Sequence, residues 1–392
     1  MVLRGEQGSG LEWAIVARNI LVGKGFVFNF YGTQIPRYAF FPPFYPYFLA
    51  FAKSLSPSHW VGLVQLVQGV FFAFGAVWVR RLSGRFLRDD LALFAGYLAA
   101  VWPPLVIYSI RLTPACFHAA AIPGLLLLLD AAMRRPAFWR SSLAGAGYGL
   151  LAYSLPSFLG SLLLLPLASG LGRTGWRRGL LVTVQIFAVA LLVLSPWTAR
   201  NFRVLHRFVP VATNIGFNLF GSQNAYASSS YNVLCLGDTT EARLVDYAEL
   251  AATNEADFDG KMLRRGISYM LDNPIQTAER SLTRILFLWW ANPHVAGYNF
   301  VEGISIIILM SFLLPLFLLG LFASFRFPCK DSLFLVYCVL AWQTLFYMNF
   351  AVRGRYSLEL YPLMIMFAMP GCGVIVELVR QKASAFSEAV GG

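Results

Sequence analysis

Residues 303–325 read GISIIILMSFLLPLFLLGLFASF, an apolar run without a charged side chain. About 20 such residues in a helix cross the hydrocarbon core of a bilayer. The whole chain of 392 residues shares this character, being 58% hydrophobic and only 13% charged. Lipid offers the backbone no hydrogen-bond partners, so a spanning segment must be a helix or part of a closed barrel. The runs lack the period-two alternation of barrel strands. The sequence therefore predicts an all-α, polytopic transmembrane helical bundle.

Further apolar runs bring the expected number of spans to about nine. They are predicted at 60–79, 91–110, 114–133, 141–155, 157–172, 178–197, 303–325, 331–350 and 359–379. The fourth and fifth are short, and Pro156 between them could mark a tight turn or a kink. An odd number of spans with a cytoplasmic C-terminus puts the N-terminal segment on the outer face. The long polar loop after residue 197 then shares that face.

The net charge of +12 reflects topology and does not indicate nucleic-acid binding. Basic side chains follow alternate spans, as the positive-inside rule requires of cytoplasmic loops. These are Arg80, Arg81, Arg85 and Arg88, then Arg134, Arg135 and Arg140, then Arg173, Arg177 and Arg178, then Arg326 and Lys330, and finally Arg380 and Lys382.

Five regions are expected along the chain. They are an extracytoplasmic first loop (1–57), six spans (58–197), an extracytoplasmic helical loop (198–302), three spans (303–380) and a cytoplasmic tail (381–392). Apolar residues at helical spacing predict surface helices at 11–22 and 44–55, and two more at 239–256 and 258–271. The long loop is therefore expected to form a small helical cap.

Common signatures of soluble enzymes do not occur in the sequence, which has no Walker loop, HExxH or GxSxG motif. The five cysteines form no CxxC pair and are expected to act as small apolar side chains. His118, beside a span, is expected to be packed or hydrogen-bonded and not a metal ligand. The acidic residues show no metal-ligand spacing, so the sequence predicts no metal site and requires no cofactor, and dependence on a divalent metal stays open.

Charged residues on the outer face are the candidates for chemistry. Glu12 in the first predicted helix, with Glu6 beside it, is a candidate general base, because a carboxylate near lipid has a raised proton affinity. Several basic residues near span ends could grip a phosphate, although any one of them could be an interfacial anchor. They are Lys24, Arg37, Arg200, Arg203, Arg353 and Arg355.

Four blocks of the sequence carry a resemblance to a known family. They are LEWAIVARNILVGKGF at 11–26, FFPPFYPYFLAF at 40–51, SPWTARNFRVLHRFVPVATNIGFNLFGSQN at 195–224, and GRYSLELYPLMIMFA at 354–368. In this order they resemble the GT-C superfamily of membrane glycosyltransferases, in particular the bacterial relatives of protein O-mannosyltransferase and of lipid A aminoarabinose transferase. The resemblance implies a substrate pocket lined by Trp13, Tyr38, Tyr45, Trp197, Asn201, Asn214, Asn218 and Tyr356.

The resemblance also implies an activity. Such enzymes pass a sugar, with inversion, from a polyprenyl-phosphate carrier to a lipid, glycan or protein acceptor. An acidic residue of the first outer loop acts on the acceptor, and basic residues bind the phosphate. The expected location is the bacterial inner membrane, with an extracytoplasmic active site. Two alternatives are a transporter or flippase for a lipid-linked substrate and an inactive envelope scaffold.

The sequence departs from the family pattern at two places. The family normally begins with a span before the first outer loop, and here none precedes residue 11. Members commonly carry an aspartate where this sequence has Ser9, followed by Gly10. Glu12 is therefore the expected substitute for the family's acidic residue.

Overall fold

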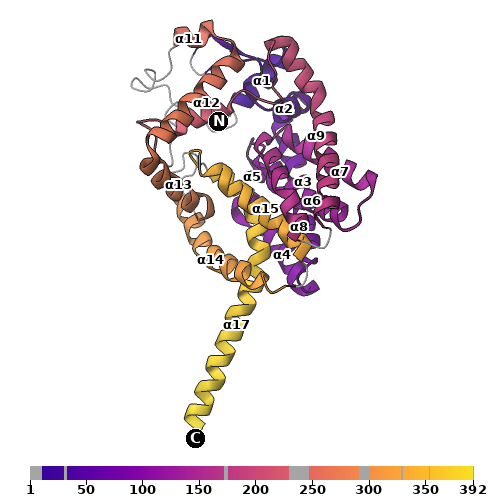
Figure 1. The fold of residues 1–392 in the computed structure, drawn as a ribbon, viewed down its shortest axis with the longest axis vertical. Coiled ribbons are helices and arrows are strands. Elements are labelled where there is room, and N and C mark those ends of the chain that lie inside the picture. Colours follow the sequence, from indigo (N-terminus) through magenta and orange to yellow (C-terminus); the bar gives the residue numbers. More distant parts are fainter. Residues whose placement is uncertain are drawn as a thin grey trace.

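The fold is almost entirely helical, which confirms the predicted fold class (Figure 1). A computed structural model describes residues 11–30, 33–171, 175–228, 247–290, 300–327, 330–352 and 354–391. Its first helices are α1 (Leu11–Leu21), α2 (Phe44–Leu55), α3 (Trp60–Ser83), α4 (Asp89–Val101), α5 (Pro103–Ile110), α6 (Ala115–Arg134), α7 (Phe138–Ala152), the 3-10 helix η2 (Pro156–Leu164) and α8 (Leu165–Leu171). Next come α9 (Trp176–Leu205), α10 (Ile215–Ser222), α11 (Tyr247–Ala252), α12 (Glu255–Asp272), α13 (Pro274–Trp289), α14 (Phe300–Ser324), α15 (Lys330–Tyr347), α16 (Gly354–Ser357) and α17 (Tyr361–Gly391). Strands β1 (Phe28–Asn29) and β2 (Pro36–Arg37) form one short antiparallel pair.

Every run expected to span the membrane falls on helical structure, but fewer helices are long enough to cross. Within the described ranges, α3, α6, α9, α14 and α17 have the length and hydropathy of membrane spans. The pair α4 and α5 makes a sixth if it is counted as one bent span. The bend of 46° lies at Trp102, because a residue before proline is pushed out of the α conformation and Pro103 and Pro104 follow it.

The remaining expected spans are short. The run at 141–155 corresponds to the 15 residues of α7, and the run at 157–172 is divided between η2 and α8. Pro156 begins the 3-10 turn, so it separates these segments and is more than a kink. Of α15, residues Ser332–Tyr347 form a shorter apolar helix. The bundle therefore combines long spans with partial ones.

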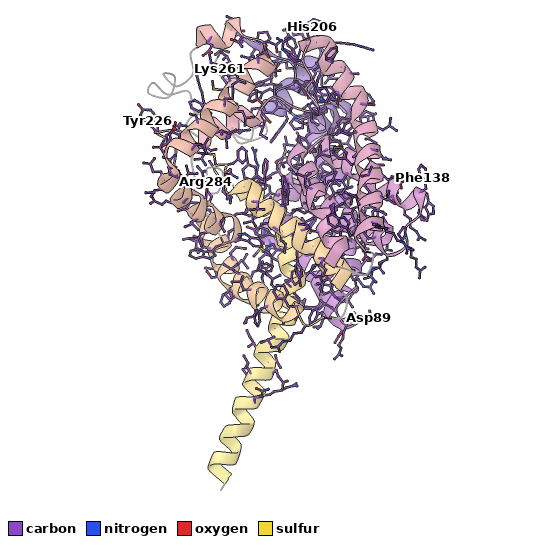
Figure 2. All side chains as sticks on the ribbon, in the orientation of Figure 1. Asp89, Phe138, His206, Tyr226, Lys261 and Arg284 are labelled. Atoms are coloured by element: carbon purple, nitrogen blue, oxygen red, sulfur yellow. The ribbon has the colours of Figure 1, made fainter. Side chains whose placement is uncertain are left out.

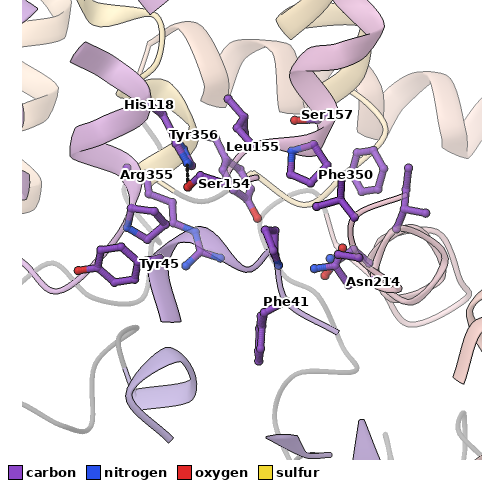
Figure 3. A pocket seen from close by; sticks show the side chains of 18 of the residues that line it. Phe41, Tyr45, His118, Ser154, Leu155, Ser157, Asn214, Phe350, Arg355 and Tyr356 are labelled. Atoms are coloured by element: carbon purple, nitrogen blue, oxygen red, sulfur yellow. Dashed lines mark hydrogen bonds between the residues drawn. The ribbon is translucent and has the colours of Figure 1, made fainter. Parts of the chain in front are cut away.

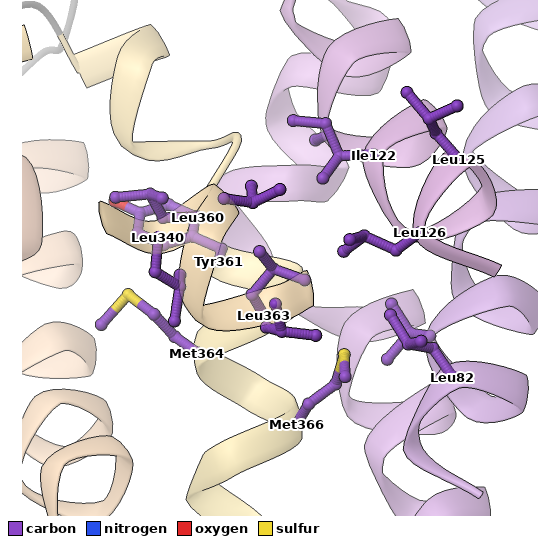
Figure 4. Packing of buried hydrophobic residues seen from close by; sticks show 14 of the residues in the cluster. Leu82, Ile122, Leu125, Leu126, Leu340, Leu360, Tyr361, Leu363, Met364 and Met366 are labelled. Carbon is purple, nitrogen blue, oxygen red and sulfur yellow. The ribbon is translucent and has the colours of Figure 1, made fainter. Parts of the chain in front are cut away.

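Close helix contacts hold the bundle together at glycines. A Cβ atom on Gly320 of α14 would lie 1.6 Å from the carbonyl oxygen of Phe367 in α17, and one on Gly371 would lie 1.9 Å from that of Leu316. Small residues allow such backbone contact between helices in membranes. On its other side α17 packs against α6 and α3, where Leu126, Leu363 and Leu82 belong to one apolar cluster (Figure 4).

A cap of short helices covers one end of the bundle, where α1, α2, α11 and α12 gather (Figure 1). Helices predicted at 11–22, 44–55 and 258–271 are confirmed as α1, α2 and most of α12. The one predicted at 239–256 is described only from residue 247, where α11 begins. Asp89, in the first turn of α4, lies at the opposite end from His206 and Lys261 (Figure 2).

The two polar parts of the chain meet in this cap through Glu255, a buried residue in the first turn of α12. Its carboxylate accepts hydrogen bonds from the backbone N–H of Tyr38 at 2.6 Å and of Ala39 at 3.1 Å. It also accepts a short hydrogen bond from the hydroxyl of Thr213. Nearby, Arg37 donates to the carbonyl of Leu250 at 2.9 Å. The N-terminal segment and the long loop are therefore in direct contact.

A second buried carboxylate joins α10 to α12. Asp259 accepts a hydrogen bond from the backbone N–H of Phe217 at 2.9 Å. A Cβ atom on Gly216 would lie 1.9 Å from the carbonyl oxygen of Asp259, so the two helices touch at backbone distance. Burial raises the pKa of Asp259 to about 6; the N–H groups of Phe217 and Gly216 oppose this rise, and the nearby Glu255 adds to it.

This raised pKa predicts that the cap loses stability as the pH rises. The folded state holds the Asp259 proton more tightly than the unfolded state, whose pKa is near 3.8. The contribution of this group is fully present below about pH 4 and is lost by about pH 6, up to about 3 kcal/mol. Asp259→Asn keeps an acceptor for Phe217 but cannot ionise, so it should flatten this part of the profile in thermal unfolding in nanodiscs between pH 4 and 7.

Asp257→Asn is the matched control. Asp257 lies on the same helix as Asp259, but it is exposed and forms an ion pair with Arg207. The ion pair lowers the pKa of Asp257, so its contribution is lost as the pH falls, which is the opposite direction. An Asp259→Asn profile that runs parallel to that of the unmodified protein would contradict the assignment.

Candidate functional site

A cavity of about 430 Å³ lies where the cap meets the bundle (Figure 3). Its lining comes from distant parts of the chain. Of the residues predicted for the site, it contains Glu12, Trp13, Tyr45, Asn214, Asn218, Arg355 and Tyr356. Phe40, Phe41, Phe346 and Phe350 add aromatic surface. A polar and aromatic cavity of this size suits a small organic group.

Glu12 and Arg355 bring opposite charges to this cavity. Glu12 stands in the first turn of α1, where the helix dipole favours a negative charge. The guanidinium of Arg355, in α16, lies 5.5 Å from the ring centroid of Trp13 and 5.4 Å from that of Tyr356. Burial lowers the pKa of Arg355, but Tyr356 and then Glu12 raise it by more, so the net pKa is above the ordinary arginine value. The site thus pairs a carboxylate with a permanently charged arginine.

Other predicted site residues do not line the cavity: Lys24, Arg37, Tyr38, Trp197, Arg200, Asn201 and Arg203. Arg37 is 4% exposed and lies between the rings of Phe30 and Phe258. Burial lowers its pKa, against the opposing effect of Glu255. With its donor directed to the carbonyl of Leu250, Arg37 joins strand β2 to helix α11 of the cap.

Arg200 has a similar position. It donates to the carbonyls of Tyr38 at 2.5 Å and of Phe26 at 3.2 Å, and its guanidinium lies 4.7 Å from the Trp197 ring centroid. Asn201 donates to the carbonyls of Val209 and Val211. The hydrogen bonds of Arg200 and Asn201 thus hold the backbone that supports the cavity wall.

Two other predicted residues, Glu6 and Arg353, lie outside the described residues.

A hydrogen-bonded group on one side of the cavity was not expected from the sequence. Nδ1 of His118 lies 3.3 Å from Oε1 of Glu359, and Nε2 lies 2.8 Å from the hydroxyl of Ser154 (Figure 3). Tyr347 donates to both oxygens of Glu359 at 3.2 Å. His118 is hydrogen-bonded, as expected. The signal that could have revealed the group is Glu359 itself, a carboxylate at the start of an apolar span.

The part of the chain described contains no group of three or more His, Cys, Asp or Glu that could hold an ion. Cys116, Cys338 and Cys372 are free thiols there, the first buried, the second half-buried and the third exposed.

The long apolar helices define an integral membrane protein, with the cavity at the capped end of its bundle. No protein-family model and no curated protein matches the sequence. Solved structures of an oligosaccharyltransferase from Archaeoglobus fulgidus do match. The apo form has a TM-score of 0.56 at 12% identity, over 97% of this chain and 48% of that one.

Two further structures from the same archaeon agree. The oligosaccharyltransferase AglB in complex with an inhibitory peptide and a dolichol-phosphate has a TM-score of 0.53 at 14% identity, over 97% of this chain and 48% of its own. The form tethered to an acceptor peptide with the NVT sequon has a TM-score of 0.54 at 13% identity, over 95% and 46%. At these identities the likeness shows the fold. The chain spans about half the length of these structures.

The contacts of Arg37 predict a structural role. Arg37→Ala would leave the buried carbonyl of Leu250 without its donor, which should lower the free energy of unfolding by about 1–3 kcal/mol. Thermal unfolding in nanodiscs measures this change. Arg203→Ala is the control, because Arg203 is exposed in the last turn of α9 and should stay within about 0.5 kcal/mol. Equal stability of both variants would contradict the role given to Arg37.

Proposed function

We propose that this chain is a membrane glycosyltransferase that moves a sugar from a polyprenyl-phosphate carrier to an extracytoplasmic acceptor. One observation carries the proposal: Glu12 and Arg355, which are 343 positions apart in the sequence, line one cavity beside aromatic side chains. A transporter would not require a carboxylate and an arginine together at the bundle end, and a scaffold would not require the cavity.

The chemistry we propose is a single inverting displacement. The Glu12 carboxylate accepts the proton of an acceptor hydroxyl, and the hydroxyl oxygen attacks the anomeric carbon of the sugar. The bond from that carbon to the phosphate oxygen breaks, and the electron pair leaves with the polyprenyl phosphate. The guanidinium of Arg355 stabilises the charge on the leaving phosphate, since fixed charges aimed at a developing anion lower the barrier.

The carrier explains why the site lies at one end of a membrane bundle. A polyprenyl chain stays in the bilayer, so its phosphate reaches only as far as the interface. The related folds give matching precedents, since one solved oligosaccharyltransferase is in complex with a dolichol-phosphate and another is tethered to an acceptor peptide.

An extracytoplasmic site in a bacterial inner membrane is the orientation we propose. Arg80 and Arg81 lie in the last turn of α3, and Arg134 in the last turn of α6. His118, in the first turn of α6, lines the cavity. The arginines at the ends of α3 and α6 therefore lie opposite the cavity, and the positive-inside rule gives that end of the bundle to the cytoplasm.

Replacing the proposed base tests the function directly. Glu12→Gln keeps nearly the same shape but removes the proton acceptor, so sugar transfer should fall by about 10²–10⁴-fold. The assay measures transfer from a panel of polyprenyl-phosphate sugars in nanodiscs. Glu279→Gln, an exposed acid on α13, is the control and should keep full activity. Full activity of Glu12→Gln would eliminate this residue as the base.

The proposed phosphate contact makes a separate prediction. Arg355→Ala removes a charge-assisted hydrogen bond, so it should weaken carrier binding by about 1.5–3 kcal/mol. Binding of undecaprenyl phosphate to the protein in nanodiscs measures this. The exposed Arg18 of α1 provides the control variant Arg18→Ala. If both variants bind the carrier as the unmodified protein does, Arg355 does not hold the phosphate.

A further inference from the structure

Four residues beside the cavity are hydrogen-bonded in the order Ser154, His118, Glu359 and Tyr347. We call these residues the imidazole cluster. All four residues line the cavity. They come from the ends of α7, α6, α15 and α17 and from the turns beside these ends. Polar side chains are costly inside an apolar bundle unless they are paired or functional. The cluster therefore needs an explanation beyond packing.

Glu359 fixes the other members and does not itself offer a binding surface. It is 2% exposed. Its two oxygens accept from His118, from Tyr347 and, by a short hydrogen bond, from the side-chain amide of Gln343. A carboxylate that accepts from Nδ1 of a neutral histidine leaves Nε2 as the acceptor. Nε2 is the ring atom that meets the Ser154 hydroxyl. Glu359 thus orients the imidazole toward Ser154.

The cluster is adjacent to the proposed phosphate contact. The ring of Tyr347 stacks on that of Tyr356 with centroids 4.6 Å apart and an angle of 16°. Arg355 precedes Tyr356 directly, and Glu359 follows four positions after Arg355. A group joined to a phosphate at Arg355 would therefore extend along the tyrosine pair toward His118 and Ser154.

We infer that the Ser154 hydroxyl binds a hydroxyl group of the carrier's sugar, with His118 and Glu359 as the positioning residues. This inference rests on the proposed function. The Ser154 hydroxyl donates to Nε2 of His118 and keeps an acceptor lone pair, to which a sugar hydroxyl can donate. The polyprenyl chain has no group that could use this contact. The cluster therefore distinguishes a glycosylated carrier from a bare one.

The test compares two ligands that differ only in the sugar. Undecaprenyl phosphate and undecaprenyl-phosphate-linked hexoses are titrated against the full chain in nanodiscs, without sugar-headed detergents that would compete. The unmodified protein should bind at least one glycosylated carrier more tightly than the bare one. Ser154→Ala should weaken that binding about tenfold and leave affinity for the bare carrier unchanged. Ser161→Ala, a buried serine bonded to Tyr148, is the matched control.

Two further variants separate positioning from folding. His118→Asn retains a donor for Glu359 but removes Nε2, so it should reproduce the selective loss. Glu359→Gln should do the same, because it releases the imidazole. An equal loss for both ligands, matched by a lower unfolding temperature, would make the cluster purely structural and overturn the inference.

Other outcomes are equally distinct. If the unmodified protein binds the carrier but Ser154→Ala leaves its preference for the glycosylated form intact, the inference fails and the proposed function stands. If the unmodified protein binds neither ligand, the proposed function itself fails. Covalent labelling of Ser154 by a fluorophosphonate would also overturn the inference, because Ser154 would then be an activated nucleophile, as in a Ser-His-acid triad.

Discussion

The buried carboxylate of Glu255 is the contact on which the cavity depends. It accepts hydrogen bonds from the backbone N–H groups of residues 38 and 39 and from the hydroxyl of Thr213. The next residues along both segments, Phe40 and Asn214, already belong to the cavity lining. One side chain therefore sets the position of two walls, one from the N-terminal segment and one from the long polar loop. A buried charge with three donors is stable only while all of them remain in place, so the walls are held as a unit.

Below these walls the helices provide a rigid frame. Glycines 320 and 371 bring α14 and α17 to backbone distance, so the segment that begins α17 has little freedom to move. Arg355 and Glu359 lie just before that segment. The proposed phosphate contact and the orientation of the imidazole thus depend on one short stretch of backbone. In contrast, Arg37 and Arg200 direct their donors to main-chain carbonyls, which makes them part of the frame.

Much of the fold could be predicted because it rests on local patterns. Apolar runs located the spanning segments found in the described residues, and helical spacing located α1 and α2 nearly to the residue. The number of complete spans was harder to predict. The length of an apolar run does not reveal that Pro156 starts a 3-10 turn or that Trp102 lies at a bend. These features depend on proline backbone restrictions within otherwise uniform apolar runs.

The candidate site could likewise be predicted only in part. Glu12 and Arg355 could be selected as charged residues beside apolar segments, but nothing local separates Arg355 from Arg37. That difference arises from a carbonyl 213 positions away. Likewise, His118 and Glu359 meet across 241 positions. Pairings of this range depend on how the helices assemble, which a single sequence does not disclose.

The order of the cavity's parts along the chain also has a consequence for biosynthesis. Its lining begins at residue 12 and ends at residue 359, so the ribosome makes its first and last parts 347 positions apart. The earlier helices can enter the membrane while part of the cavity lining has not yet been made. A partly translated copy therefore has an incomplete cavity until the segment from α15 to Glu359 has been made.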